Sequence, residues 1–113
     1  MTDVVYINEA EGRKRLMNNG KLYAKILTKF VADTNLEDLV ALAKAEEWEK
    51  AQASAHALKG VAANLSLIEL FNQAAALEIR IKEKAVNLES LENLRSCFSK
   101  TLAQVEIVIA QYA

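Results

Sequence analysis

Apolar residues recur along most of the chain at alternating spacings of three and four, which is the period of an amphipathic α-helix. The clearest run forms one narrow seam made of Trp48, Ala51, Ala55, Leu58, Ala62 and Leu65. A second run with the same spacing contains Leu67, Leu70, Ala74, Leu77 and Ile81. A third contains Leu88, Leu91, Leu94, Phe98, Leu102, Val105, Ile109 and Tyr112. The pattern predicts three long helices in the second half of the chain, with a break near Asn87.

The first half of the chain carries two apolar stripes that differ in phase. One contains Tyr23, Ile26, Leu27 and Phe30, and the other contains Leu36, Leu39, Val40 and Ala43. The phase slips across Asp33-Thr34-Asn35. We predict one long helix that begins near Lys21 and bends at this point, although two shorter helices explain the slip equally well.

Local signals mark where helices begin and end. Asn8 and Glu11 have the spacing of a capping box, in which each side chain bonds an unpaired backbone amide at a helix start. They predict a short helix over residues 9–17, ended by Asn18-Asn19-Gly20 because Asn and Gly tolerate left-handed backbone angles. Ser66 and Glu69 repeat the capping spacing, so we predict that the next helix begins at Ser66.

The composition favours helix almost everywhere, since the chain has no proline and only three glycines. Its 113 residues suit one hydrophobic core, so we predict a single domain over residues 1–113. Short connections force successive helices to run antiparallel. The predicted fold is all-α: an antiparallel four-helix bundle over residues 21–112, with the short N-terminal helix as a cap. The expected core includes Trp48, Leu58, Leu70, Leu77 and Phe98.

Charge and cysteine content narrow the range of partners. The net charge is −1, so no large basic field is available to bind nucleic acid. No apolar run approaches the roughly 18–20 residues that span a bilayer, and no basic segment feeds an apolar stretch at the N-terminus. Cys97 is the only cysteine, which excludes an internal disulfide; we expect it to be a small packed hydrophobe. These features predict a cytoplasmic protein with no membrane partner.

The only histidine, His56, lies one position past the seam residue Ala55, so we expect an exposed ring on the flank of its helix. Residues three, four, seven and eight positions away share or border its face: Gln52, Lys59, Gly60, Ala63 and Asn64. Lys59 places a cation one turn from the imidazole. Gly60 costs on the order of 1 kcal/mol against alanine inside a helix, where no turn is needed. A glycine there removes bulk where another surface must come close, and Ala63 extends the flat patch.

Other chemistries lack the residues they need. A metal site fails because Gln52 and Gly60 stand four positions from His56 and provide no second ligand. No serine is placed to form a hydrolytic triad with the imidazole. No glycine-rich phosphate loop is present, so we expect neither an ATP site nor enzymatic activity of the chain by itself.

The segment His56-Ala57-Leu58-Lys59-Gly60-Val61-Ala62-Ala63-Asn64 resembles the signature helix of histidine-containing phosphotransfer (HPt) domains, which reads His-x-Leu-Lys-Gly followed by small residues. The likeness covers roughly residues 8–82 and includes Leu22-Tyr23, Phe30, Leu70 and Leu77-Glu78. The last helix matches only in pattern. One departure is Ser66, where the family commonly has glycine.

The resemblance implies a role for each residue of the patch. His56 is expected to accept a phosphoryl group through Nε2, Lys59 to neutralise it, and Gly60 to give clearance. Gln52, Ala63 and Asn64 are expected to help dock the partner. The chain itself would bind no cofactor and no metal. Mg²⁺ is expected on the partner's receiver domain, since no acidic cluster stands beside His56 to hold it.

The same resemblance implies a phosphorelay intermediate in two-component signalling. It would exchange a phosphoryl group between His56 and an aspartate of response-regulator receiver domains, as a monomer supplied by a hybrid histidine kinase. Two alternatives stay open. One is the phosphoacceptor domain of a chemotaxis-type kinase, which an ATP-binding domain phosphorylates directly. The other is a non-phosphorylatable helical adaptor that docks receivers. The sequence does not name the cognate kinase, the regulator, the signal or the output.

Overall fold

The structure is a computed structural model that describes residues 4–112, so the ends of the predicted domain, residues 1–3 and 113, lie outside the described residues. The described part is all-helical and contains no strand. Its helices are α1 (Glu9–Lys14), α2 (Gly20–Asp33), α3 (Leu36–Lys44), α4 (Trp48–Asn64), α5 (Ile68–Lys82) and α6 (Leu88–Gln111). Within residues 4–112 no helix is both long enough and apolar enough to cross a membrane.

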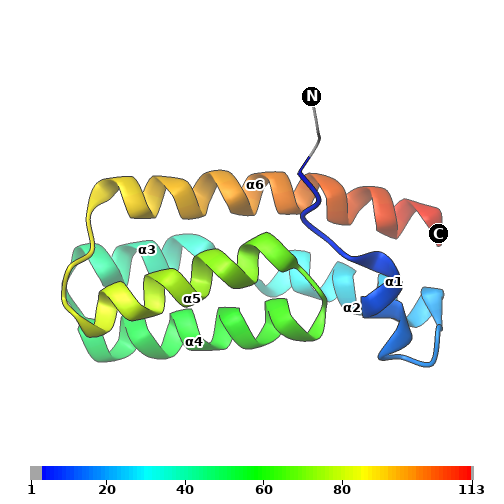
Figure 1. The fold of residues 1–113 in the computed structure, drawn as a ribbon, viewed down its shortest axis with the longest axis horizontal. Coiled ribbons are helices and arrows are strands. Elements are labelled where there is room, and N and C mark those ends of the chain that lie inside the picture. Colours follow the sequence, from blue (N-terminus) through cyan, green and yellow to red (C-terminus); the bar gives the residue numbers. More distant parts are fainter. Residues whose placement is uncertain (1–3, 113) are drawn as a thin grey trace.

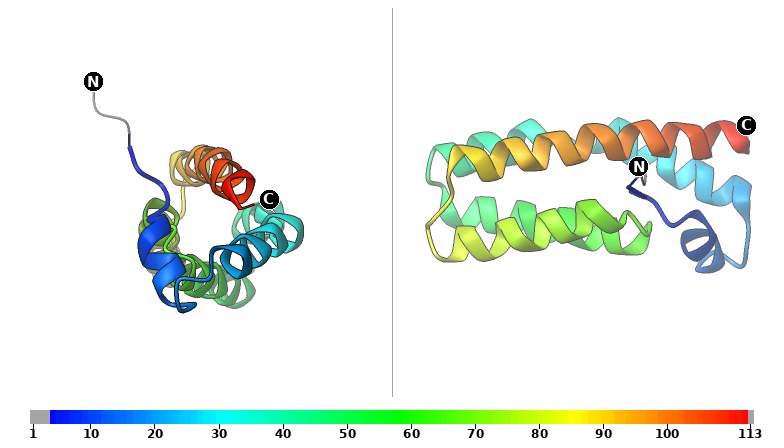
Figure 2. Two further views of the ribbon diagram at one scale, coloured as in Figure 1. Left: turned by 90° about the vertical axis from the view of Figure 1, so that its right-hand side faces the viewer. Right: turned by 45° about the horizontal axis from the view of Figure 1, so that its top comes forward.

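The helices pack as an elongated bundle (Figure 1). Helices α4, α5 and α6 lie lengthwise, and α2 and α3 follow one another along the remaining side. Viewed along its long axis, the bundle surrounds a common core, and α1 lies at one end (Figure 2). Helices α4 and α5 have the most extensive contact of any two helices. Their close approach follows from the seam of α4, where Ala51, Ala55 and Ala62 are fully buried and present only a methyl group.

Most of the predicted core is buried, and two aromatic residues are the exception. Leu58, Leu70 and Leu77 are buried as expected. Trp48 and Phe98 were expected to be buried but are only partly buried: both pack against the core while part of each side chain stays in solvent. Phe98 meets Phe30 edge-on, with 6.1 Å between ring centroids.

The phase slip in the first half of the chain separates two helices, so the prediction of one bent helix is wrong. Thr34 is extended, with φ −86° and ψ 118°, and ends α2. The side chain of Asn35 then accepts a hydrogen bond from the Glu37 amide and starts α3. An N-cap of this kind stabilises a new helix start, which the continuous-helix reading did not allow for.

Helix α1 ends at Lys14, three residues before the predicted end, and Met17 and Asn18 have left-handed backbone angles in the turn that follows. Only half of the predicted capping box forms. The Asn8 side chain accepts from the Glu11 amide, but the Asn8 amide donates to the Ser66 carbonyl, 2.9 Å away. The Glu11 carboxylate accepts hydrogen bonds from Arg15, Ser66 and, at 3.4 Å, the Asn8 side chain instead of the Asn8 backbone amide.

Ser66 does not begin a helix, so that prediction is also wrong. Its φ is 58°, in the left-handed region, and Leu67 occupies the N-cap position of α5 without a side-chain hydrogen bond. The buried Ser66 hydroxyl instead donates to Glu11 and accepts from Arg15. This contact ties α1 to the turn between α4 and α5. A complete capping box forms at the start of α6, between Asn87 and Ser90.

Candidate functional site

His56 stands on the exposed side of α4, and its ring contacts the neighbouring helix α5. Its side chain is 69% exposed, as the flank position predicted. The Nδ1 atom lies 3.2 Å from Oε2 of Glu78, which belongs to the neighbouring helix α5. The ring is therefore accessible to a partner and is held at one nitrogen.

Glu78 is a buried carboxylate that joins three side chains. Only 7% of its side chain is exposed. Nζ of Lys59 lies 2.8 Å from Oε1, while His56 and, at 4.0 Å, Nζ of Lys82 approach Oε2. The hydrogen bond from Lys59 lowers the pKa of the Glu78 carboxyl below its ordinary value; burial acts in the opposite direction, and nearby positive charge adds to the lowering. Glu78 is thus ionised at neutral pH.

An ionised Glu78 determines which nitrogen of His56 carries the proton. A carboxylate without a proton can only accept hydrogen bonds, so Nδ1 must be the donor in this contact. In a neutral imidazole the other nitrogen then has a free lone pair. In that tautomer Nε2, the ring nitrogen that does not contact Glu78, has the lone pair that a nucleophile needs.

The strip of α4 around His56 is open to solvent. Gly60, Ala63 and Asn64 are exposed, and Gln52 is half-buried. A Cβ atom built on Gly60 would meet nothing within 4 Å, so no neighbour within the fold requires a glycine there. Lys59, at 29% exposure, leans away from this strip toward Glu78. The structure brings Gln52, Gly60 and Ala63 together on the face of His56. Asn64 lies at the far end of the strip, where its backbone carbonyl accepts a hydrogen bond from Nη1 of Arg15, 3.5 Å away.

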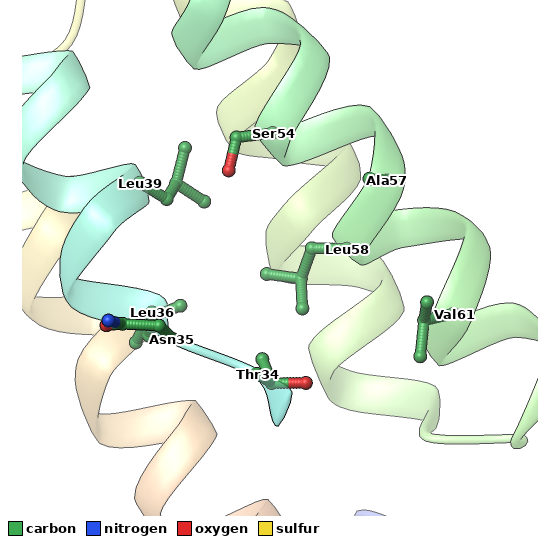
Figure 3. A pocket seen from close by; sticks show the side chains of 8 residues that line it. All are labelled: Thr34, Asn35, Leu36, Leu39, Ser54, Ala57, Leu58 and Val61. Carbon is green, nitrogen blue, oxygen red and sulfur yellow. The ribbon is translucent and has the colours of Figure 1, made fainter. Parts of the chain in front are cut away.

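An apolar groove follows the opposite flank of α4, beside the junction of α2 and α3. Figure 3 shows the side chains that line it: Thr34, Asn35, Leu36, Leu39, Ser54, Ala57, Leu58 and Val61. An adjoining hollow shares Thr34 and Val61 and extends past Ile26 and Phe30 to Asn64. Because Ala57 and Val61 directly follow His56 and Gly60 along the helix, the groove adjoins the open strip. The break between α2 and α3 opens it.

Glu78 is a site residue that helical spacing from His56 does not identify, because that spacing gives only neighbours on the same helix. A signal was nevertheless present. Glu78 follows the seam residue Leu77, just as His56 follows Ala55, so both stand on flanks of helices that pack together. The flank position alone does not predict burial, because Lys82 follows the seam residue Ile81 in the same way and is exposed.

The sequence was compared with family models, curated proteins and solved structures. The model described as Hpt domain matches residues 26–106 of the 113. The matched range contains His56, Lys59, Gly60, Glu78 and Lys82. Compared with the expected likeness over residues 8–82, it extends further, into α6, but does not include residues 8–25, where Leu22-Tyr23 lies. No curated protein and no solved structure gave a match.

Proposed function

The chain belongs to the Hpt domain family, and we propose that it is a phosphorelay intermediate that carries a phosphoryl group on Nε2 of His56. Members of this family are phosphotransfer carriers in two-component signalling without an ATP site of their own. The observation that carries the assignment to His56 is the contact between its Nδ1 atom and the buried, ionised Glu78.

In the transfer, the Nε2 lone pair attacks the phosphorus of an aspartyl phosphate on a receiver domain. The bond between phosphorus and the aspartyl oxygen breaks, and the receiver's carboxylate leaves with that electron pair. The proton on Nδ1 stays in place, so the phosphorylated ring carries a positive charge. The reverse reaction returns the phosphoryl group to an aspartate and regenerates neutral imidazole with a free Nε2.

The neighbours of His56 supply position and charge for this step. Transfers of this kind depend mainly on in-line positioning and on stabilising charge. Glu78 orients the ring and balances its positive charge in the phosphorylated state. Lys59, one turn along α4, offers an ammonium group for the phosphoryl oxygens. Mg²⁺ would be held by the receiver, since Glu78, the carboxylate that contacts His56, is already engaged by Lys59.

We propose that the receiver docks over the open strip and the groove beside it. A standard interface buries about 800 Å² on each partner, far more than a strip of His56, Gly60 and Ala63 provides. The border with α5 is charged, whereas the groove on the other flank is apolar and leaves Val61 41% exposed. Gln52 and Asn64 would contact the receiver at the two ends of the strip, and an apolar side chain would enter the groove.

The wider context of this function follows from the same proposal. The phosphoryl group would come from the receiver of a hybrid histidine kinase and pass to a second receiver, in the cytoplasm where such receivers act. The chain would work as a monomer and as one domain over residues 1–113. If α2 and α3 are taken together as one interrupted helix, the fold is an antiparallel four-helix bundle capped by α1.

The experiment that tests the function mixes the protein with a panel of receiver domains carrying radiolabelled aspartyl phosphate. At least one receiver is expected to lose label to the wild-type chain within seconds. No receiver should lose label to the His56→Gln variant. Lys50→Gln, which removes an exposed charge two turns from His56 on α4, serves as the control and should behave as wild type. Label that moves only from an ATP-binding kinase domain would favour the chemotaxis-type alternative. No label from any donor would support the adaptor.

A further inference from the structure

Two lysines approach Glu78, but they do so unequally. Lys59 contacts Oε1 at hydrogen-bond distance, 2.8 Å, and is mostly enclosed. Lys82 stands 4.0 Å from Oε2, beyond hydrogen-bond distance, and 55% of its side chain is exposed. Among the described residues no other lysine or arginine pairs with Glu78. In the unphosphorylated protein Lys82 is therefore a second cation that is close by and free to move.

Phosphorylation of His56 changes the balance of charge around this carboxylate. A phosphoryl group adds about two negative charges on the side of the ring away from Glu78. Lys59 is then attracted to two acceptors that lie on opposite sides of the imidazole. If it moves to the phosphoryl oxygens, it leaves a nearly fully buried carboxylate oxygen without its partner, which is costly.

Resting on the proposed function, we infer that Lys82 replaces Lys59 on Glu78 when His56 is phosphorylated. Lys82 belongs to the same helix as Glu78, four residues further on, a spacing at which side chains meet without backbone movement. The exchange releases Lys59 for the phosphoryl group and keeps Glu78 ionised and paired. Glu78 therefore continues to hold Nδ1 in both states. Lys82 is a positioning residue in this scheme, because it acts through Glu78.

The surroundings of Lys82 are compatible with such a movement. Its side chain borders a polar hollow that also contains Glu46, Glu47, Glu49 and Lys50, at the turn between α3 and α4. Within residues 4–112 none of those carboxylates forms an ion pair with Lys82. The ammonium group therefore has no competing anchor to leave when it closes on Glu78.

The test uses potassium phosphoramidate as a small phosphate donor, so that no receiver is needed. At a fixed ratio of phosphoramidate to ammonia, the ratio of phosphorylated to free His56 is measured by ³¹P NMR. We expect about a fivefold lower ratio for Lys82→Gln, the scale of one partly exposed ion pair. Lys82→Arg should retain the wild-type ratio because it keeps a cation. Lys84→Gln, which removes an equal charge from the following turn, is the matched control and should also retain it.

A second readout follows the exchange itself. In labelled wild-type protein the side-chain ¹³Cε and ¹⁵Nζ signals of Lys59 and Lys82 should both move on phosphorylation, while those of Lys84 stay. Equal ratios for Lys82→Gln and Lys84→Gln, or an unmoved Lys82 signal, would overturn the inference while the proposed function stands. Failure of wild-type His56 to take up any phosphate would overturn both.

Discussion

Replacement of Gly60 by alanine should change stability and phosphotransfer in opposite directions. Glycine inside a helix is less stable than alanine by roughly 0.5–1 kcal/mol, because it loses more backbone freedom on folding. The added methyl meets nothing within 4 Å, so no clash offsets this gain. For a domain of 113 residues, 1 kcal/mol corresponds to about 4 °C in melting temperature. Gly60→Ala should therefore melt about 2–4 °C higher than wild type.

The same methyl group stands one turn from His56 on the face that the receiver must approach. Transfer from a phosphorylated receiver should become slower in Gly60→Ala and nearly stop in Gly60→Glu, although both proteins stay folded. Thermal melts followed by circular dichroism measure the change in stability, and transfer reactions quenched at successive times measure the change in rate. Gly12→Ala is the control, since its methyl would overlap the buried Tyr23 ring and should lower the melting temperature. If Gly60→Ala melts lower than wild type and transfers at the normal rate, the glycine serves packing and the docking argument fails.

Two further predictions concern Glu78 and Ser66. Because the pKa of Glu78 is lowered in the folded protein, its ionised form stabilises the fold above its ordinary value of 4.5, and this contribution is lost as pH falls through the folded value. In urea unfolding, the free energy of unfolding of the wild type should thus exceed that of Glu78→Gln at pH 7, and this difference should shrink as the pH falls below the ordinary carboxyl value. A difference that does not change with pH would contradict the prediction. Ser66→Gly should be about 1 kcal/mol more stable than Ser66→Ala, since both lose the hydroxyl and only glycine suits a φ of 58°. Equal melting temperatures of those two variants would show that the left-handed backbone at position 66 costs no stability.

The long helices were predictable because their apolar seams are unambiguous. The seam from Ala51 to Leu65 is buried throughout, and the flank position of His56 gave its exposure correctly. The break at Thr34 was visible as a phase slip, but a slip of phase does not distinguish a bend from an interruption. The second helix start is marked by a hydrogen bond that the Asn35 side chain accepts from the Glu37 amide, and the apolar pattern does not show whether that bond forms.

The parts of the site that the sequence did not predict depend on contacts between distant segments. Ser66 is a residue type that favours a helix start, yet its hydroxyl forms hydrogen bonds with Glu11 and Arg15 at α1. The left-handed backbone at position 66 gives a physical reason for glycine to be favoured there. Glu78 was missed for the same reason, since it is 22 positions from His56 and meets it only once α4 and α5 have packed.

The most direct test of the central claim is to identify the phosphorylated atom. Wild-type protein phosphorylated by a receiver domain, or by phosphoramidate, is examined by ³¹P NMR and by ¹H–¹⁵N correlation of the imidazole nitrogens. The account predicts one acid-labile phosphoryl group, bonded to Nε2 of His56, with the proton kept on Nδ1 beside Glu78. Phosphate on Nδ1, on any residue other than His56, or on none would contradict it.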